Sequence, residues 1–309
     1  MATTGVRLAP LAPAEALRPA RSLWRDAWFQ FRRHRLAMVG LFTLAFIVLA
    51  TLVGPYVWTQ PTNDIDFSRS LLGPSVTHPF GTDDLGRDMF ARALSGGRIS
   101  IAVGLSAVLI AITLGTTIGA VAGYFGRLDS PLMRLTDLFL SLPILPLLLV
   151  IIFLFRDTLR AALGPELGIF LMIVAVIGIL NWMAVARLVR ASFLSLKQKE
   201  FVEAARAVGA PHLRIIVKHI LPNVLSPVLV AATIGVGGAI LTESTLSFLG
   251  LGFPSDLPTW GRLLFDGKDY IDFAPHWAIF PGLCIFLTVL SINFIGDGLR
   301  DALDPRRGL

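Results

Sequence analysis

Acidic side chains gather in one short segment of this chain, where their spacing suits either a cation site or the start of a helix. Three carboxylates closely follow His78, at Asp83, Asp84 and Asp88. Hard cations bind where several oxygen ligands converge, and three aspartates on a short helix could provide them. The same residues are typical of a capped helix, with Thr82 as the N-cap and a helix that runs to Leu94. We favour the capped helix and predict no metal site.

A single acidic residue, Glu243, lies inside an apolar run of the chain. An ionisable residue within a membrane-spanning segment is a functional candidate, because a charge is costly to place in lipid. Glu243 is therefore a candidate pathway or gate residue. It lies near the end of its run, where charge costs less, so a bracing role through hydrogen bonds to neighbouring helices stays open.

The sequence shows no pattern for nucleotide hydrolysis or covalent catalysis. The phosphate-binding pattern G-x-x-x-x-G-K-[ST] is absent, and the one Gly-Lys pair, Gly267-Lys268, is followed by Asp269. No nucleophile and base can be paired, nor can two carboxylates be placed together in a cleft. Cys284 is the only cysteine, which excludes an internal disulfide and a cysteine-based metal site. We predict a chain that is not an enzyme and has no cofactor.

Long apolar runs must position these residues. Hydrophobic residues make up 54% of the 309 residues and charged residues 16%, with a mean hydropathy of +0.71. A bilayer core is crossed by about 20 apolar residues in a helix, which satisfies its own backbone hydrogen bonds. Six runs reach that length or nearly so: 36–58, 99–126, 138–155 (extended back toward 132), 167–186, 220–242 and 274–296. The sequence predicts an all-α membrane protein with six transmembrane helices.

The basic residues predict how these helices are oriented. The predicted segments are a tail 1–35, a first transmembrane helix 36–58, an external loop 59–98, a five-helix core 99–296 with a basic loop 187–222 and an external loop 250–273, and a tail 297–309. Of 27 Lys and Arg residues, 19 lie on the side of the N-terminus. The positive-inside rule therefore places both termini in the cytoplasm. The net charge of +6 reflects this topology and membrane lipid rather than nucleic acid.

Glycine and proline within the apolar runs predict local features of the helices. Gly115, Gly119 and Gly123 recur every four residues, which suits close approach of a second helix. A glycine group in the fifth run, at Gly235, Gly237 and Gly238, should loosen that helix. Pro143 and Pro146 should kink the third. Leu23 to Phe31 suits an interfacial helix.

The segment 200–222 is polar and basic although it lies between apolar runs. Gly209 and Pro211 predict two short helices joined at a tight turn. On the first helix one face carries four apolar residues, at Phe201, Ala204, Ala205 and Val208. Glu203 lies off this stripe. Because the loop is expected in water, we infer that the striped face docks against another protein.

This segment resembles the EAA loop of ABC importer permeases. The pattern is met by Glu203-Ala204-Ala205, by Gly209, and by the Leu and Pro of Ile220-Leu221-Pro222; only His219 departs from it. Three further segments resemble the peptide and nickel branch of these permeases, and within it the C-type subunits. They are HPFGTDDLGRD from His78, TESTLSFLGLG from Thr242 and NFIGDGLRDALDP from Asn293.

The resemblance implies a type I importer permease fold, in which the last five of six helices form the shared core. It implies half of an ATP-driven pathway for dipeptides or oligopeptides across the inner membrane. The implied partners are two ATP-binding cassette subunits, a second homologous permease in a heterodimer, and an extracytoplasmic solute-binding protein. The implied coupling residues are Phe201, Glu203, Ala204, Ala205, Val208, Gly209 and Pro222.

Other transport functions stay open at this point. Permeases of this kind also import nickel chelates or glutathione-like peptides, and the sequence does not choose among these substrates. A secondary transporter or channel that works alone is a different class. Such proteins usually carry ionisable residues near the membrane midplane or internal repeats. This chain has a nearly uncharged midplane and no evident repeat, which favours the importer subunit.

Overall fold

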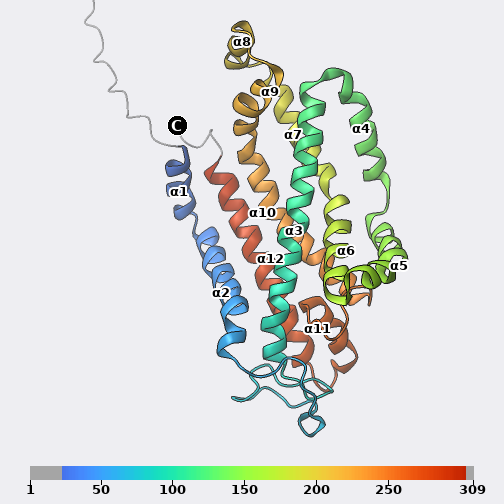
Figure 1. The fold of residues 1–309 in the computed structure, drawn as a ribbon. Helices are drawn as coiled ribbons and strands as arrows, with labels where there is room; N and C mark the ends of the chain where they lie inside the picture. Colours follow the sequence, from blue (N-terminus) through green and yellow to red (C-terminus); the bar gives the residue numbers. More distant parts are fainter. Residues whose placement is uncertain (1–22, 304–309) are drawn as a thin grey trace, which may run out of the picture.

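The computed structural model of this protein describes residues 23–303, in which long helices run between two ends of an elongated bundle (Figure 1). Helices α1 and α8 and the last turn of α12 lie at one end, which we call the α8 end. Helix α11 and the long loop after α2 lie at the opposite end, which we call the α11 end.

Helices follow one another along nearly all of the described chain. Their bounds are α1 Leu23–Arg33, α2 Arg35–Val57, η1 Phe67–Arg69, α3 Met89–Tyr124, α4 Gly126–Ser141, α5 Ile144–Leu163, α6 Pro165–Ile179, α7 Trp182–Leu196, α8 Glu200–Ala207, α9 His212–Arg214, η2 Ile215–Ile220, α10 Leu221–Phe248, α11 Trp260–Gly267, η3 Lys268–Tyr270 and α12 His276–Ala302. The segments η1 and η3 are 3₁₀ turns, and η2 is a π-helix.

Within the described residues, five segments are long and apolar enough to cross a membrane. They are α2, α3, α6 with α7 (Pro165–Leu196), α9 through α10 (His212–Phe248), and α12. Each overlaps one of the predicted runs, which confirms five of the six. The segments extend beyond the runs because polar turns continue the helices outside the apolar stretch. The clearest case is α3, which begins ten residues before the predicted start at 99.

The third predicted run has a different structure from the expected kinked helix. Helix α4 ends at Ser141, α5 begins at Ile144, and the two are bent by 85° at this break. Pro143 stands at the N-cap of α5, where its ring cannot continue the preceding helix. A sixth span exists only if this bent pair counts as one.

The glycine repeat of α3 packs against α7, as predicted. A Cβ atom added at Gly115 would lie 2.6 Å from Cβ of Val185, and one at Gly119 would lie 2.5 Å from the carbonyl oxygen of Ala186. A Cβ at Gly123 would lie 2.5 Å from Cβ of Phe193. Only hydrogen at these positions allows the two helices to approach this closely.

Helix α1 is only partly the interfacial helix that the sequence predicts. Phe31 is buried, and it packs with Ala37, Ile295 and Ala302 of the neighbouring helices α2 and α12. Trp28, in contrast, exposes half of its surface. One face of α1 therefore docks on the bundle, and an aromatic face stays uncovered at the α8 end.

Candidate coupling site

Helix α8 is a two-turn helix whose end is set by Gly209. This glycine has φ +79°, a conformation that side chains with a Cβ rarely adopt. The amide of Gly209 donates to the carbonyl of Arg206 at 2.9 Å, and the amide of Ala210 donates to that of Ala205 at 3.0 Å. These two bonds form the Schellman motif, which satisfies the last carbonyls of a helix. The predicted tight turn is confirmed.

The two faces of α8 differ sharply in exposure. Val202 is fully buried and Ala205 nearly so, whereas Phe201 and Val208 expose 41% and 84% of their surface. Ala204 is exposed as well. The predicted stripe is therefore divided, because Ala205 faces the protein's own bundle instead of sharing the exposed face. The outward apolar face consists of Phe201, Ala204 and Val208, with the exposed carboxylate of Glu203 beside it.

The inner face of α8 packs into a buried cluster that joins three other helices. Val202 and Ala205 belong to one hydrophobic cluster with Tyr124 of α3, Phe193 of α7 and Ile215 of η2. All three of these partners are buried. Two apolar side chains of the short helix, Val202 and Ala205, thus pack it against the bundle.

The helix after the turn continues without interruption into the membrane. Segments α9, η2 and α10 follow one another residue by residue from His212 to Phe248. Pro222, which lies near the start of the predicted run 220–242, is the second residue of α10 and lies within this continuous helix. A proline removes one helical hydrogen bond and crowds the carbonyl four residues earlier. The π-helix η2 stands directly before it, and such bulges accommodate this kind of strain.

Glu243 lies inside the bundle and is fully buried. Its carboxylate accepts hydrogen bonds from the hydroxyls of Ser247, at 2.8 Å, and of Ser100, at 3.3 Å. Ser100 belongs to α3 and also accepts a bond from the backbone of Trp260 in α11. These contacts support the bracing alternative, in which Glu243 links α10 to α3, over an exposed gate.

At the α11 end the acidic segment does not form the predicted helix. Helix α3 begins at Met89, and its N-cap is Asp88, which accepts a bond from the amide of Ala91 at 3.0 Å. Thr82 instead binds the loop before it, accepting from the amide of Leu72 at 2.8 Å. The start moves because Gly86 has φ +76°, so residues 83–87 form a turn and not a helix.

The carboxylates of this segment each bind a neighbouring side chain. Asp83 accepts from Nε of Arg87 at 2.6 Å, and Asp88 lies 3.1 Å from Nδ1 of His78. The hydroxyl of Tyr270 donates to Asp84 at 3.3 Å, and this negative charge raises the pKa of Tyr270 above its usual value. Among the described residues, no three His, Cys, Asp or Glu side chains are arranged to hold a metal ion.

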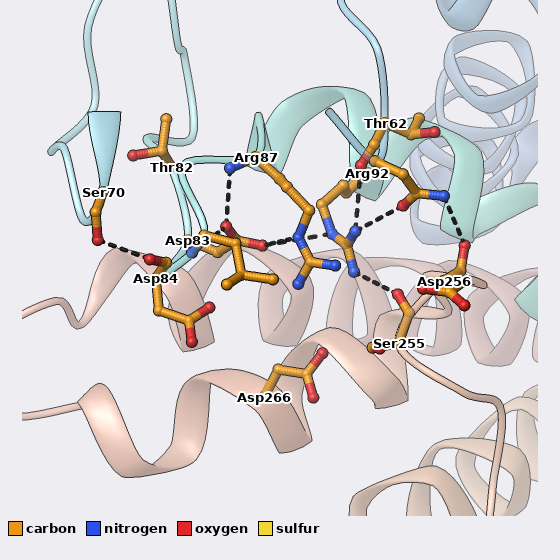
Figure 2. Close-up of polar contacts among 12 residues, drawn as sticks. Thr62, Ser70, Thr82, Asp83, Asp84, Arg87, Arg92, Ser255, Asp256 and Asp266 are labelled. Atoms are coloured by element: carbon orange, nitrogen blue, oxygen red, sulfur yellow. Dashed lines mark hydrogen bonds and ion pairs between the residues drawn. The ribbon is translucent and has the colours of Figure 1, made fainter. Parts of the chain in front are cut away.

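Arg92 joins the loops of the α11 end, and the sequence reading did not identify it. Its side chain is fully buried in the first turn of α3. The guanidinium donates to the carbonyl of Thr62 at 3.1 Å, to the side chain of Asn63 at 2.9 Å and to the carbonyl of Ser255 at 2.8 Å. Figure 2 shows it between the loops that carry Thr62 and Ser255. A charged residue among small residues close to an apolar run was the available signal.

Two family profiles match this chain. The one described as "Binding-protein-dependent transport system inner membrane component" matches residues 111–308, which include α8 and Gly209. The other, described as "N-terminal TM domain of oligopeptide transport permease C", matches residues 22–74, which include α2.

Curated proteins resemble the chain over nearly its full length. A dipeptide transport system permease protein of Alkalihalophilus pseudofirmus is 43% identical, covering 95% of this chain and 93% of the relative. An oligopeptide transport system permease protein of Haemophilus influenzae is also 43% identical, with 93% and 89% covered. A glutathione transport system permease protein of Pectobacterium atrosepticum is 40% identical, with 97% of each chain covered.

Among solved structures, the inward-facing MetNI methionine ABC transporter contains a chain of similar fold. Its TM-score is 0.55 at 20% identity, covering 70% of this chain and 97% of the other. This likeness supports the type I importer fold, and the profiles and relatives identify the family. The chain therefore belongs to the binding-protein-dependent transport system inner membrane components, and it is a multi-pass inner-membrane permease subunit of an ABC transporter.

Proposed function

We propose that this chain forms half of the translocation pathway of an importer for short peptides, and that α8 couples it to separate ATPase subunits. The observation that carries the coupling role is the outward apolar face of Phe201, Ala204 and Val208 on a helix that is otherwise packed on the bundle. Exposed apolar surface beside polar groups is typical of a protein interface.

The peptide class is supported by the names of the three relatives, whose substrates are dipeptides, oligopeptides and glutathione. These share a peptide backbone with a free carboxylate, and they differ in length and side chains. The binding protein that delivers the substrate would therefore make the finer choice. A nickel chelate is the remaining alternative for the same architecture.

The mechanism follows from how α8 is joined to the membrane helices. ATP binding would close two ATPase subunits and move the α8 helices docked on them, one from this chain and one from a second, related permease. Helix α10 receives this motion because the chain is helical from His212 to Phe248. Only the turn at Gly209 separates α8 from that helix. The wall of the pathway would then tilt, which opens it to the opposite side.

The coupling role is tested by making the outward face polar. Phe201→Ser and Val208→Ser leave the buried residues of α8 in place, so membrane insertion should be unchanged. Each should reduce substrate uptake and copurification of the ATPase subunits about fivefold, since an interface anchor contributes 1 kcal/mol or more. Val76→Ser is the matched control, because Val76 exposes 95% of its surface at the α11 end. Normal uptake and copurification in both α8 variants would rule out the docking role.

We also propose that the α8 end is cytoplasmic, as the distribution of Lys and Arg predicts. A reporter at the C-terminus should then be active in the cytoplasm, and one inserted beside the exposed Val76 should be active outside. An external C-terminus would contradict this orientation and place α8 beyond the reach of an ATPase.

A further inference from the structure

We propose that Tyr124 is the positioning residue through which a displacement of α8 reaches the membrane helices. This inference rests on the proposed coupling role of α8. Tyr124 would fix the angle between α8 and the membrane helices, which the outward face of α8 cannot do by itself.

Tyr124 is the last residue of α3, and its side chain is 4% exposed. Its hydroxyl lies 2.8 Å from Nδ1 of His212, the first residue of the helix that continues into α10. Its backbone carbonyl accepts a hydrogen bond at 2.6 Å from Nζ of Lys197, the C-cap residue of α7. One tyrosine thus binds both the element before α8 and the element after it.

The aromatic ring of Tyr124 contacts α8 itself through a cation. Cζ of Arg206, in the last turn of α8, lies 6.0 Å from the ring centroid, and Nζ of Lys197 lies 5.5 Å from it. A cation within about 6 Å of an aromatic ring is attracted by the ring's quadrupole. The imidazole of His212 meets the same ring edge to face, with centroids 5.6 Å apart.

Three elements of the α8 end, namely the C-terminus of α7, α8 and α9, therefore contact one buried residue of α3. Val202 and Ala205 add apolar contacts between α8 and the bundle. Apolar burial is non-directional, so it holds α8 near the bundle without fixing its angle. Hydrogen bonds weaken steeply when their angle changes, so a tilt of α9 relative to Tyr124 is resisted. Arg206 ties α8 to the same tyrosine through its ring. Motion of the docked helix is then passed to α3 and α10 together.

Two substitutions separate the parts of this contact. Tyr124→Phe removes only the hydroxyl that binds His212, and Tyr124→Leu also removes the ring that attracts Arg206. Neither touches Phe201 or Val208, so the ATPase subunits should still copurify. The matched control is Tyr56→Phe at the α11 end, where Arg98 lies 5.0 Å above the ring of an exposed tyrosine.

The readout is the amount of substrate imported per ATP hydrolysed, measured on the assembled transporter in vesicles with the loaded binding protein. Tyr124→Leu should lower this ratio about tenfold and Tyr124→Phe about threefold, within the range by which single substitutions change the coupling between distant sites. ATP hydrolysis without the binding protein should stay within about twofold of normal, and Tyr56→Phe should change nothing. A merely structural role would lower the yield of the complex and leave the ratio intact.

A double substitution tests the contact itself. His212→Ala combined with Tyr124→Phe should cost little more than either alone, because both remove the same hydrogen bond. An unchanged ratio in Tyr124→Leu, or fully additive losses in the double variant, would overturn the proposal. Failure of the proposed function looks different. It would appear as normal uptake and copurification in the Phe201 and Val208 variants, whatever Tyr124 does.

Discussion

The two ends of this protein hold their loops in different ways. At the α11 end, Arg92 is fully buried and donates to three acceptors in two loops. The same two loops are joined by a hydrogen bond from Asn63 to the carbonyl of Asp256, 193 residues further along the chain. At the α8 end, helix α8 and its C-cap residue leave Phe201 and Val208 exposed. The loops of the α11 end are thus joined by a buried charged side chain, whereas the α8 end presents an apolar helix face that a partner would cover. Under the proposed coupling role of α8, the ATPase would act at the α8 end, and the loops of the α11 end would keep their arrangement.

The contrast is also visible in how each end uses its glycines. A Cβ at Gly86 would lie 1.9 Å from the carbonyl oxygen of Asp66, so the turn there is enclosed by the chain itself. A Cβ at Gly209 would have no atom within 4 Å, so the α8 turn stands free among the described residues. Both glycines have positive φ. The first position requires glycine for space and conformation, the second for conformation alone.

The largest expected effect is a loss of stability at the α11 end. Arg92→Met should destabilise the protein by about 3 kcal/mol, because it leaves the part-buried carbonyl oxygens of Thr62 and Ser255 without this donor. Arg92→Lys should recover little, since a single ammonium cannot reach three acceptors as the planar guanidinium does. Arg69→Met is the control, because the pair of Arg69 with Asp66 is exposed. The measurement is the thermal unfolding midpoint of the purified complex; equal midpoints for Arg92→Met and Arg69→Met would remove the distinction between the two ends.

The second expected effect is smaller and is confined to the α8 end. Gly209→Ala should cost about 1 kcal/mol in the turn, through the positive φ and not through a steric clash. Uptake should fall with it about fivefold, the ratio that this energy corresponds to. Gly209→Pro should be worse, because it also removes the amide that donates to Arg206. Membrane insertion should be normal in both, since no span depends on this turn.

Gly126→Ala is the matched control for this experiment. Gly126 begins α4, a Cβ there meets no atom within 4 Å, and its φ is not positive. The same added methyl group should therefore leave uptake unchanged. If Gly209→Ala also transports normally, the conformation of the α8 turn has no part in coupling.

Much of this architecture could be predicted from the sequence, because the bilayer selects long apolar helices whatever their partners. The turn at Gly209 was predictable for a local reason, since glycine suits the positive φ at a helix end. The side on which Ala205 packs was not. Ala205 shares a face with Val202 at helical spacing as well as with Phe201, and the sequence pattern alone cannot say which face meets the bundle.

The features that were missed depend on residues far apart in the chain. Arg92 is buried because its acceptors come from residues 62–63 and from Ser255, and no local pattern connects these segments. The 85° bend between α4 and α5 was underestimated for a related reason. Pro143 marks a break in the helix, but packing against neighbouring helices decides the angle between the two parts.

The smallest expected effect distinguishes the interior of the α11 end from its rim by the response to pH. Burial raises the pKa of Asp266 above its ordinary value of 3.8, while Arg262, whose guanidinium is 2.8 Å away, opposes the shift. Hydrogen bonds from Ser68 lower the pKa of the exposed Asp66, chiefly the one from its hydroxyl. The two carboxyls therefore respond to pH in opposite ways.

For Asp266 the folded protein binds the proton more tightly than the unfolded chain does. Its contribution to stability is therefore largest below pH 3.8 and falls as pH rises through the higher folded pKa. For Asp66 the contribution is present above 3.8 and is lost as pH falls through the lower folded pKa. The unfolding midpoint of the complex should be compared with that of Asp266→Asn and of Asp66→Asn over the acid range. The advantage of the parent protein should shrink with rising pH in the first comparison and grow in the second. Slopes of the same sign would show that Asp266 is as accessible to water as Asp66. The interior of the α11 end would then be more accessible to water than its hydrogen bonds indicate.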